Sequence, residues 1–133
     1  MAQDYNLQNI KFKGVLDKKY AMNLLTRGNL NIFTFANTAL LKYGVSPNKL
    51  FMYFASGKPV LSMIKPAYDL VESRKCGISV ENNPTAVADA IIKMSKLPEE
   101  EYRLYCSNAR TVAEEYDYGK LVNELIRIIE RKR

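Results

Sequence analysis

The sequence contains no histidine, and this absence removes several kinds of active site at once. Without an imidazole there is no Ser-His triad, no histidine general base and no histidine metal ligand. The two cysteines, Cys76 and Cys106, stand far apart in the sequence and have no metal-ligand spacing. We expect both to be reduced structural thiols, because disulfides are rare in the cytoplasm. No metal and no other cofactor is therefore implied.

Long apolar runs are missing as well. No run approaches the roughly 20 residues of a membrane-spanning helix, and the N-terminus lacks a signal-peptide pattern. The 133 residues show no internal repeat, low-complexity segment or linker. With 47% hydrophobic and 26% charged residues, the composition is that of an ordinary globular protein. We expect residues 1–133 to form a single domain located in the cytoplasm.

Basic residues outnumber acidic ones, 20 to 14, which gives a formal net charge of +6. A positive balance favours anionic partners: nucleic acid, phosphorylated ligands or anionic lipid. The basic residues are scattered, as on an ordinary solvated surface, apart from Arg127, Arg131, Lys132 and Arg133 near the C-terminus. That cluster can rest on an anionic membrane face. No recognition-helix pattern accompanies the charge, so we expect no nucleic-acid partner.

Strand-like and helix-like segments alternate along the chain. Strand composition or alternation is found in Ile10–Val15, Leu30–Phe35, Pro59–Met63 and Gly77–Val80. Helices are expected from Asp17 to Arg27, Ser46 to Gly57, Ala67 to Lys75, Pro84 to Met94, Pro98 to Tyr116 and from Tyr118 onward. This order predicts an α/β fold, a Rossmann-like three-layer domain with a mostly parallel sheet. Such sheets bind ligands at the carboxyl ends of their strands.

The segment YGVSPNKL, residues 43–50, has the parts of a phosphate-binding turn. Gly44 lets the backbone turn, Ser46 is a good N-cap, and Pro47 suits the first helical position. Free N–H groups at a helix start favour an anion, and Lys49 adds a positive charge there. A capped helix that carries a solvated lysine has the same pattern, so both interpretations stay open.

Four longer segments occur in the same order along the chain as the motifs of a known family. They are IKFKGVLDKKY (10–20), SPNKLFMYFASGKPVLS (46–62), KCGISVENNPTAVADAI (75–91) and ARTVAEEYDYGKLVNELIRII (109–129). Together they resemble the C-terminal, nucleotide-sugar-binding domain of retaining GT-B glycosyltransferases, the glycosyl transferases group 1 family. The resemblance covers nearly all of residues 9–130, and the second segment is similar to the donor-nucleotide region.

This resemblance implies a fold and a function. The fold is the C-terminal half of a GT-B enzyme, with the N-terminal acceptor domain absent, so the fragment alone is expected to be inactive. The donor is a UDP or GDP sugar, and the missing domain binds a lipid-linked or other glycan acceptor. The reaction belongs to capsular or other surface polysaccharide synthesis, in the cytoplasm or peripherally on the inner membrane face.

The resemblance also implies donor-binding residues but no catalytic residue on this chain. They are Gly14, Val15, Gly44, Val45, Ser46, Lys49 and Met52. Gly14 and Val15 match the turn that approaches the base of the nucleotide. The backbone and hydroxyl donors of residues 44–46, with the charge of Lys49, match the diphosphate site.

Met52 departs from the family pattern. The family usually has a glutamate there, which binds the ribose hydroxyls, and methionine is a poor acceptor. The second glutamate of the family's pair falls at Gly44 and is absent too. A non-catalytic nucleotide-binding or protein-interaction module therefore remains an alternative. A GT-B-like sugar-nucleotide epimerase fits less well, since its usual histidines are missing.

The last helix is predicted to be amphipathic over residues 119–132. In the family the corresponding helix crosses back to the N-terminal domain. We expect part of its apolar face to be bare here, which favours association, and we predict a homodimer formed through this helix.

Overall fold

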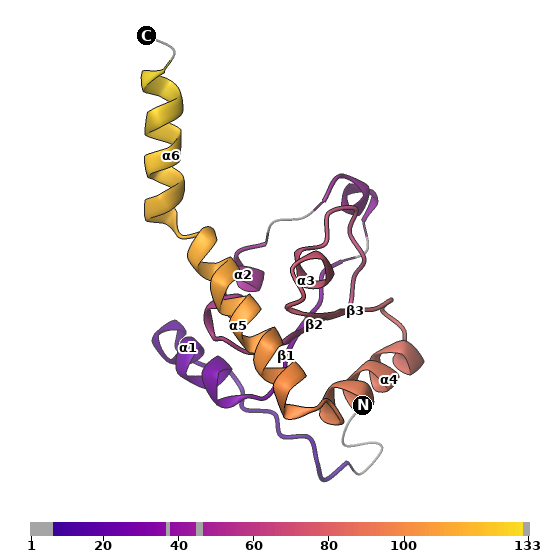
Figure 1. The fold of residues 1–133 in the computed structure, drawn as a ribbon. Coiled ribbons are helices and arrows are strands. Elements are labelled where there is room, and N and C mark those ends of the chain that lie inside the picture. The colour runs from indigo at the N-terminus through magenta and orange to yellow at the C-terminus, as the bar shows by residue number, and fades with distance from the viewer. Residues whose placement is uncertain (1–6, 37, 45–46, 132–133) are drawn as a thin grey trace.

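The computed structural model describes residues 7–36, 38–44 and 47–131. Within these residues, helices and strands alternate along most of the chain (Figure 1). The elements are α1 (Lys18–Arg27), β1 (Asn31–Phe33), the 3-10 helix η1 (Ala39–Tyr43), α2 (Asn48–Ala55), β2 (Val60–Ser62), α3 (Leu70–Ser73), β3 (Gly77–Ser79), α4 (Pro84–Ser95), α5 (Glu99–Glu115) and α6 (Tyr118–Glu130).

The strands form one parallel sheet in the order β1-β2-β3. In the register of this sheet, Ile32 lies beside Leu61, and Leu61 lies beside Ile78. The predicted α/β class with a parallel sheet is confirmed, and the architecture is compatible with a Rossmann-like domain. Each strand is three residues long, shorter than the predicted segment, but flanking residues extend the ladder: Met63 N donates to Phe33 O, and Val80 N donates to Ser62 O.

The prediction of a strand at Ile10–Val15 is wrong. The structure describes these residues and gives them no strand partner, and all of them are exposed. Phe12 is 82% exposed and Val15 is fully exposed, so the apolar alternation of this segment faces solvent. Gly14 has φ of +71°, which interrupts an extended conformation. Alternation alone cannot make a strand where no neighbouring edge accepts its backbone.

Polar caps fix where several helices begin, as their side chains predict. Asp17 accepts a hydrogen bond from Lys19 N at the start of α1, and Asn83 accepts one from Ala86 N at the start of α4. The cap of α3 is Asp69, which accepts from Val71 N, so this helix begins later than the predicted Ala67. The predicted cap of α2, Ser46, lies outside the described residues.

The main core lies between the sheet and helices α2, α3 and α5. Its fully buried side chains include Phe54 of α2, Val60 of β2, Val71 of α3 and Val112 of α5. Helix α5 runs across the body of the molecule and packs along α2 (Figure 1). A buried hydrogen bond of 2.8 Å from Asn31 Nδ2 to Ser56 Oγ fastens β1 to the end of α2. These contacts leave α6 outside the core.

Cys76 sits in this core with a free thiol. Burial disfavours the thiolate and raises the pKa of Cys76 from 9.0 to about 12, and nearby Arg74 only partly offsets this. The reactive thiolate is therefore scarce in the folded protein until the pH approaches 12, whereas unfolding restores a pKa near the ordinary value. The half-buried thiol of Cys106 also has a raised pKa, chiefly through burial.

We predict that Cys76 resists alkylation by iodoacetamide at pH 9 in the native protein and reacts readily in urea. Site-resolved mass spectrometry after timed labelling measures both rates. Cys106, which is less buried, is the internal control and is expected to react first. Equal native rates at the two sites would contradict the buried position of Cys76.

Candidate functional site

A cavity of about 380 Å³ opens where the three strands end. Its lining residues are Phe35, Leu41, Met63, Ile64, Lys65, Glu81, Asn82 and Asn83. Most of them directly follow a strand: Phe35 comes after β1, residues 63–65 after β2, and residues 81–83 after β3. Because parallel strands share their carboxyl edge, one cavity collects residues from three separate turns.

The polar groups of this carboxyl-edge cavity suit a ligand with both phosphate and hydroxyl groups. Lys65 and Glu81 supply opposite charges, and Asn82 supplies an amide that both donates and accepts. Ser62 Oγ donates to the carbonyl of Ile64 at 3.0 Å, which shapes the turn that carries Lys65. Lys65 and Glu81 are exposed, so an anion or a sugar hydroxyl can reach them from solvent.

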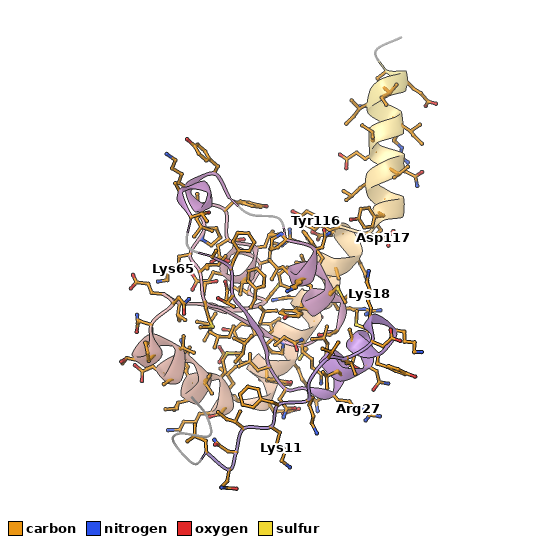
Figure 2. The ribbon with its side chains drawn as sticks, turned by 180° about the vertical axis from the view of Figure 1, so that it is seen from behind. Lys11, Lys18, Arg27, Lys65, Tyr116 and Asp117 are labelled. Carbon is orange, nitrogen blue, oxygen red and sulfur yellow. The ribbon has the colours of Figure 1, made fainter. Side chains whose placement is uncertain are left out.

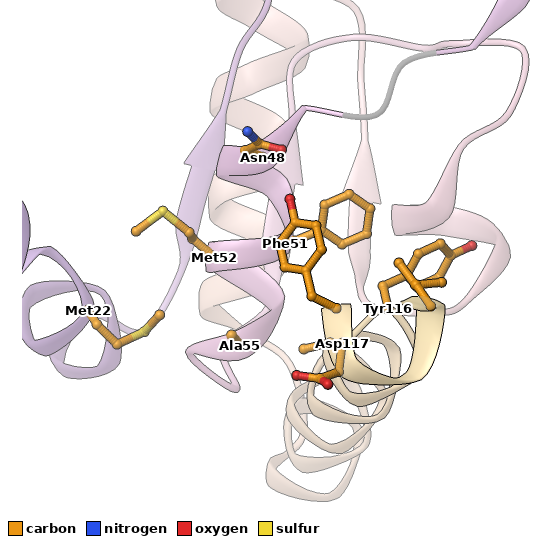
Figure 3. Close-up of a pocket in the computed structure, with 10 residues that line it drawn as sticks. Met22, Asn48, Phe51, Met52, Ala55, Tyr116 and Asp117 are labelled. Atoms are coloured by element: carbon orange, nitrogen blue, oxygen red, sulfur yellow. The ribbon is translucent and has the colours of Figure 1, made fainter. Parts of the chain in front are cut away.

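A second cavity, of about 510 Å³, lies between α1, α2, the end of α5 and the start of α6 (Figure 3). Its lining residues are Met22, Asn48, Phe51, Met52, Ala55, Ala113, Tyr116, Asp117, Tyr118 and Leu121. Most of these side chains are apolar, and the rings of Phe51 and Tyr116 lie 5.1 Å apart between centroids. Figure 2 shows Lys65 well apart from Tyr116 and Asp117, so the two cavities occupy different parts of the surface.

Tyr116 links this second cavity to the segment after β2. A hydrogen bond with Tyr68 raises the pKa of Tyr116, and burial raises it further. Just before Tyr116, Glu115 accepts two hydrogen bonds from Arg74 Nη2, at 2.5 and 2.6 Å. This carboxylate raises the pKa of Arg74, so the guanidinium is charged at every accessible pH. The end of α5 is thereby held in place beside the cavity.

Met52 is half-buried on α2 and lines the second cavity together with Asn48 (Figure 3). Met22 of α1 lines the same space, so two thioethers lie side by side in this part of the cavity wall. Thioether sulfur is a weak acceptor, and this part of the cavity therefore favours apolar contacts over ribose hydroxyls.

The other predicted diphosphate residues are close to the start of α2 in the sequence. Lys49 is exposed in the first turn and is not among the described residues that line either cavity. Gly44 ends η1 with φ of +92°, in the left-handed region that favours glycine. Val45 and Ser46 lie outside the described residues. Leu41, which precedes this turn, lines the carboxyl-edge cavity, so the chain runs from that cavity toward the start of α2.

Gly14 and Val15 lie in the exposed segment that precedes α1. Neither is among the described residues that line the two cavities, so neither cavity joins them to Gly44 or Lys49. Sequence reasoning missed Lys65, Glu81 and Asn82 as site residues. The signal that would have found them is their position directly after the predicted strands Pro59–Met63 and Gly77–Val80.

The described part of the chain has neither a cluster of metal ligands nor a membrane-spanning helix. There, no group of three or more cysteine, aspartate or glutamate side chains is arranged to hold a metal ion. No helix among the same residues is long and apolar enough to cross a membrane. Comparison with known proteins gave no match to a family model, to a curated protein or to a solved structure.

Proposed function

We propose that the chain is the donor-binding part of a retaining GT-B glycosyltransferase, which takes a UDP or GDP sugar. The observation that carries this proposal is the carboxyl-edge cavity, which Lys65, after β2, and Glu81 and Asn82, after β3, line together. The four sequence segments in the family's order support it independently. Its wider setting, surface polysaccharide synthesis with an acceptor bound by a second domain, rests on that resemblance.

In this proposal the chain binds and orients the donor and supplies no acid or base. Charge develops on the departing diphosphate, and donors held in place stabilise it. The first turn of α2, with Lys49, holds the diphosphate, and Lys65 is a further exposed cation, which lines the carboxyl-edge cavity. Because Met52 stands where the family has its ribose-binding glutamate, the ribose is held weakly.

A nucleotide titration followed by NMR tests this function. We expect UDP or GDP to bind at around millimolar Kd, with shifts at the start of α2 and at residues 81–83. Lys49→Ala removes a charge-assisted contact of about 1.5–3 kcal/mol and should weaken binding at least about tenfold. Met52→Glu should tighten binding and leave the fold intact, because Met52 lines a cavity.

The matched control is Lys96→Ala, an equal loss of charge at the exposed end of α4. It should leave the titration unchanged. A spectrum that no nucleotide perturbs, or an equal effect of the Lys49 and Lys96 variants, would count against the proposal. Unfolding by Met52→Glu, seen in circular dichroism, would mean that Met52 supports the core.

A further inference from the structure

Helix α6 carries a broad apolar face that the rest of the molecule does not cover. The structure describes all of α6, and none of its residues is buried. The α6 apolar face consists of Tyr118, Leu121, Val122, Leu125, Ile126, Ile128 and Ile129, whose exposed fractions range from 41% to 75%. Figure 1 shows α6 continuing beyond α5 and projecting away from the body. A contiguous patch of this kind marks an interaction surface.

We propose that the α6 apolar face binds a second copy of this chain, with the two α6 helices antiparallel about a two-fold axis. With the two helices overlapping around Ile128, the apolar side chains that meet are Leu125, Ile126, Ile128 and Ile129, which are 44% to 57% exposed. The face is also continuous with the second cavity, because Tyr118 and Leu121 belong to both. The apolar surface available to a partner is therefore larger than α6 alone.

Charged side chains along one edge of the face support the antiparallel arrangement. Glu124 and Arg131 are both exposed and lie about two helical turns apart, so they occupy the same edge. A two-fold axis midway between them, beside Ile128, brings each Glu124 opposite Arg131 of the second copy. Two reciprocal ion pairs then flank the apolar contact. A parallel pair in register would place Glu124 near the apolar Ile129 and form neither pair.

The same edges argue against an anionic membrane as the occupant. Helices that lie on such membranes have lysine and arginine beside their apolar face. In α6 each edge of the apolar face carries a glutamate: Glu124, beside Arg131, on one edge and Glu130 on the other. Anionic lipid would repel both carboxylates, whereas Arg131 of a second copy attracts Glu124.

Sedimentation equilibrium of the full chain tests the proposal. We expect reversible dimers whose fraction rises with protein concentration. Ile128→Lys places a charge at the centre of the contact and should weaken association about a hundredfold or more. Asn123→Lys adds the same charge on the polar face of α6 and is the matched control, which should leave the dimer nearly intact. Circular dichroism verifies that both variants fold.

A charge-swap series tests the orientation. Glu124→Arg and Arg131→Glu should each weaken the dimer about tenfold, because each creates two like-charge contacts. The double variant should recover most of the lost affinity. A monomer at every concentration overturns the proposal, and co-sedimentation of that monomer with vesicles of anionic phospholipid would assign the face to a membrane. Dimers that are insensitive to Ile128→Lys would place the interface elsewhere.

Discussion

Gly77→Ala is expected to abolish stable folding. A Cβ at this position would overlap the carbonyl oxygen of Val60 and lie 2.7 Å from its carbonyl carbon and 2.8 Å from its nitrogen. These are backbone atoms of the central strand β2, which pairs with β3 at this register position. No side chain can rotate to make room, so the methyl group must force β3 away from β2. We expect a loss of at least about 4 kcal/mol in the free energy of unfolding.

Urea denaturation followed by circular dichroism measures this loss. The control is Gly28→Ala, the same chemical change at the end of α1. There φ is −72°, and the nearest neighbour of the new Cβ would be the Leu25 carbonyl oxygen, at an ordinary 3.6 Å. That variant should unfold within about 0.5 kcal/mol of the wild type. Equal stability of the two variants would show that β2 and β3 are not as close as this register requires.

Phe54→Ala should have the second largest effect. Phe54 has no exposed surface and stands on α2 among the fully buried residues of the main core. Its ring lies edge-on to that of Phe51, with centroids 6.3 Å apart, so truncation removes both transfer free energy and a ring contact. We expect a cost of about 3–5 kcal/mol, which is the usual range for a phenylalanine deleted from a core.

The matched control is Phe12→Ala, because Phe12 is 82% exposed in the segment before α1. Its loss should change the free energy of unfolding by no more than about 0.5 kcal/mol. Thermal unfolding of the two variants side by side gives the comparison. A large effect at Phe12 would show that residues 10–15 contact a surface in solution, and a small effect at Phe54 would contradict the core.

Local chemistry explains which elements were predictable from the sequence. Asp17 caps α1 through its own side chain, and Pro84 restricts the backbone at the start of α4, so the sequence alone predicts where both helices begin. The prediction of a strand at Ile10–Val15 is wrong for the opposite reason. A strand depends on a partner supplied by distant residues, and no local pattern shows whether that partner exists.

In the candidate site, too, local features were predictable from the sequence, whereas features that depend on distant contacts were not. The turn at Gly44 was predictable because a positive φ suits glycine at low cost. The meeting of Lys65 with Glu81 and Asn82 depends on the register of β2 and β3, which brings two turns together at one edge. The second cavity is harder still to foresee. It requires Met22 of α1 to lie near Phe51 of α2 and Tyr116 of α5, and no motif in the sequence joins these residues.

The shortness of the strands has a consequence for how the protein avoids unwanted association. Within the described residues, β1 and β3 form the two outer edges of the sheet, and each is only three residues long. An incoming strand of another chain would gain few backbone hydrogen bonds along either edge, too few to repay the ordering of an extended segment. The sheet therefore offers a poor template for aggregation, and contacts between chains are left to helical surfaces.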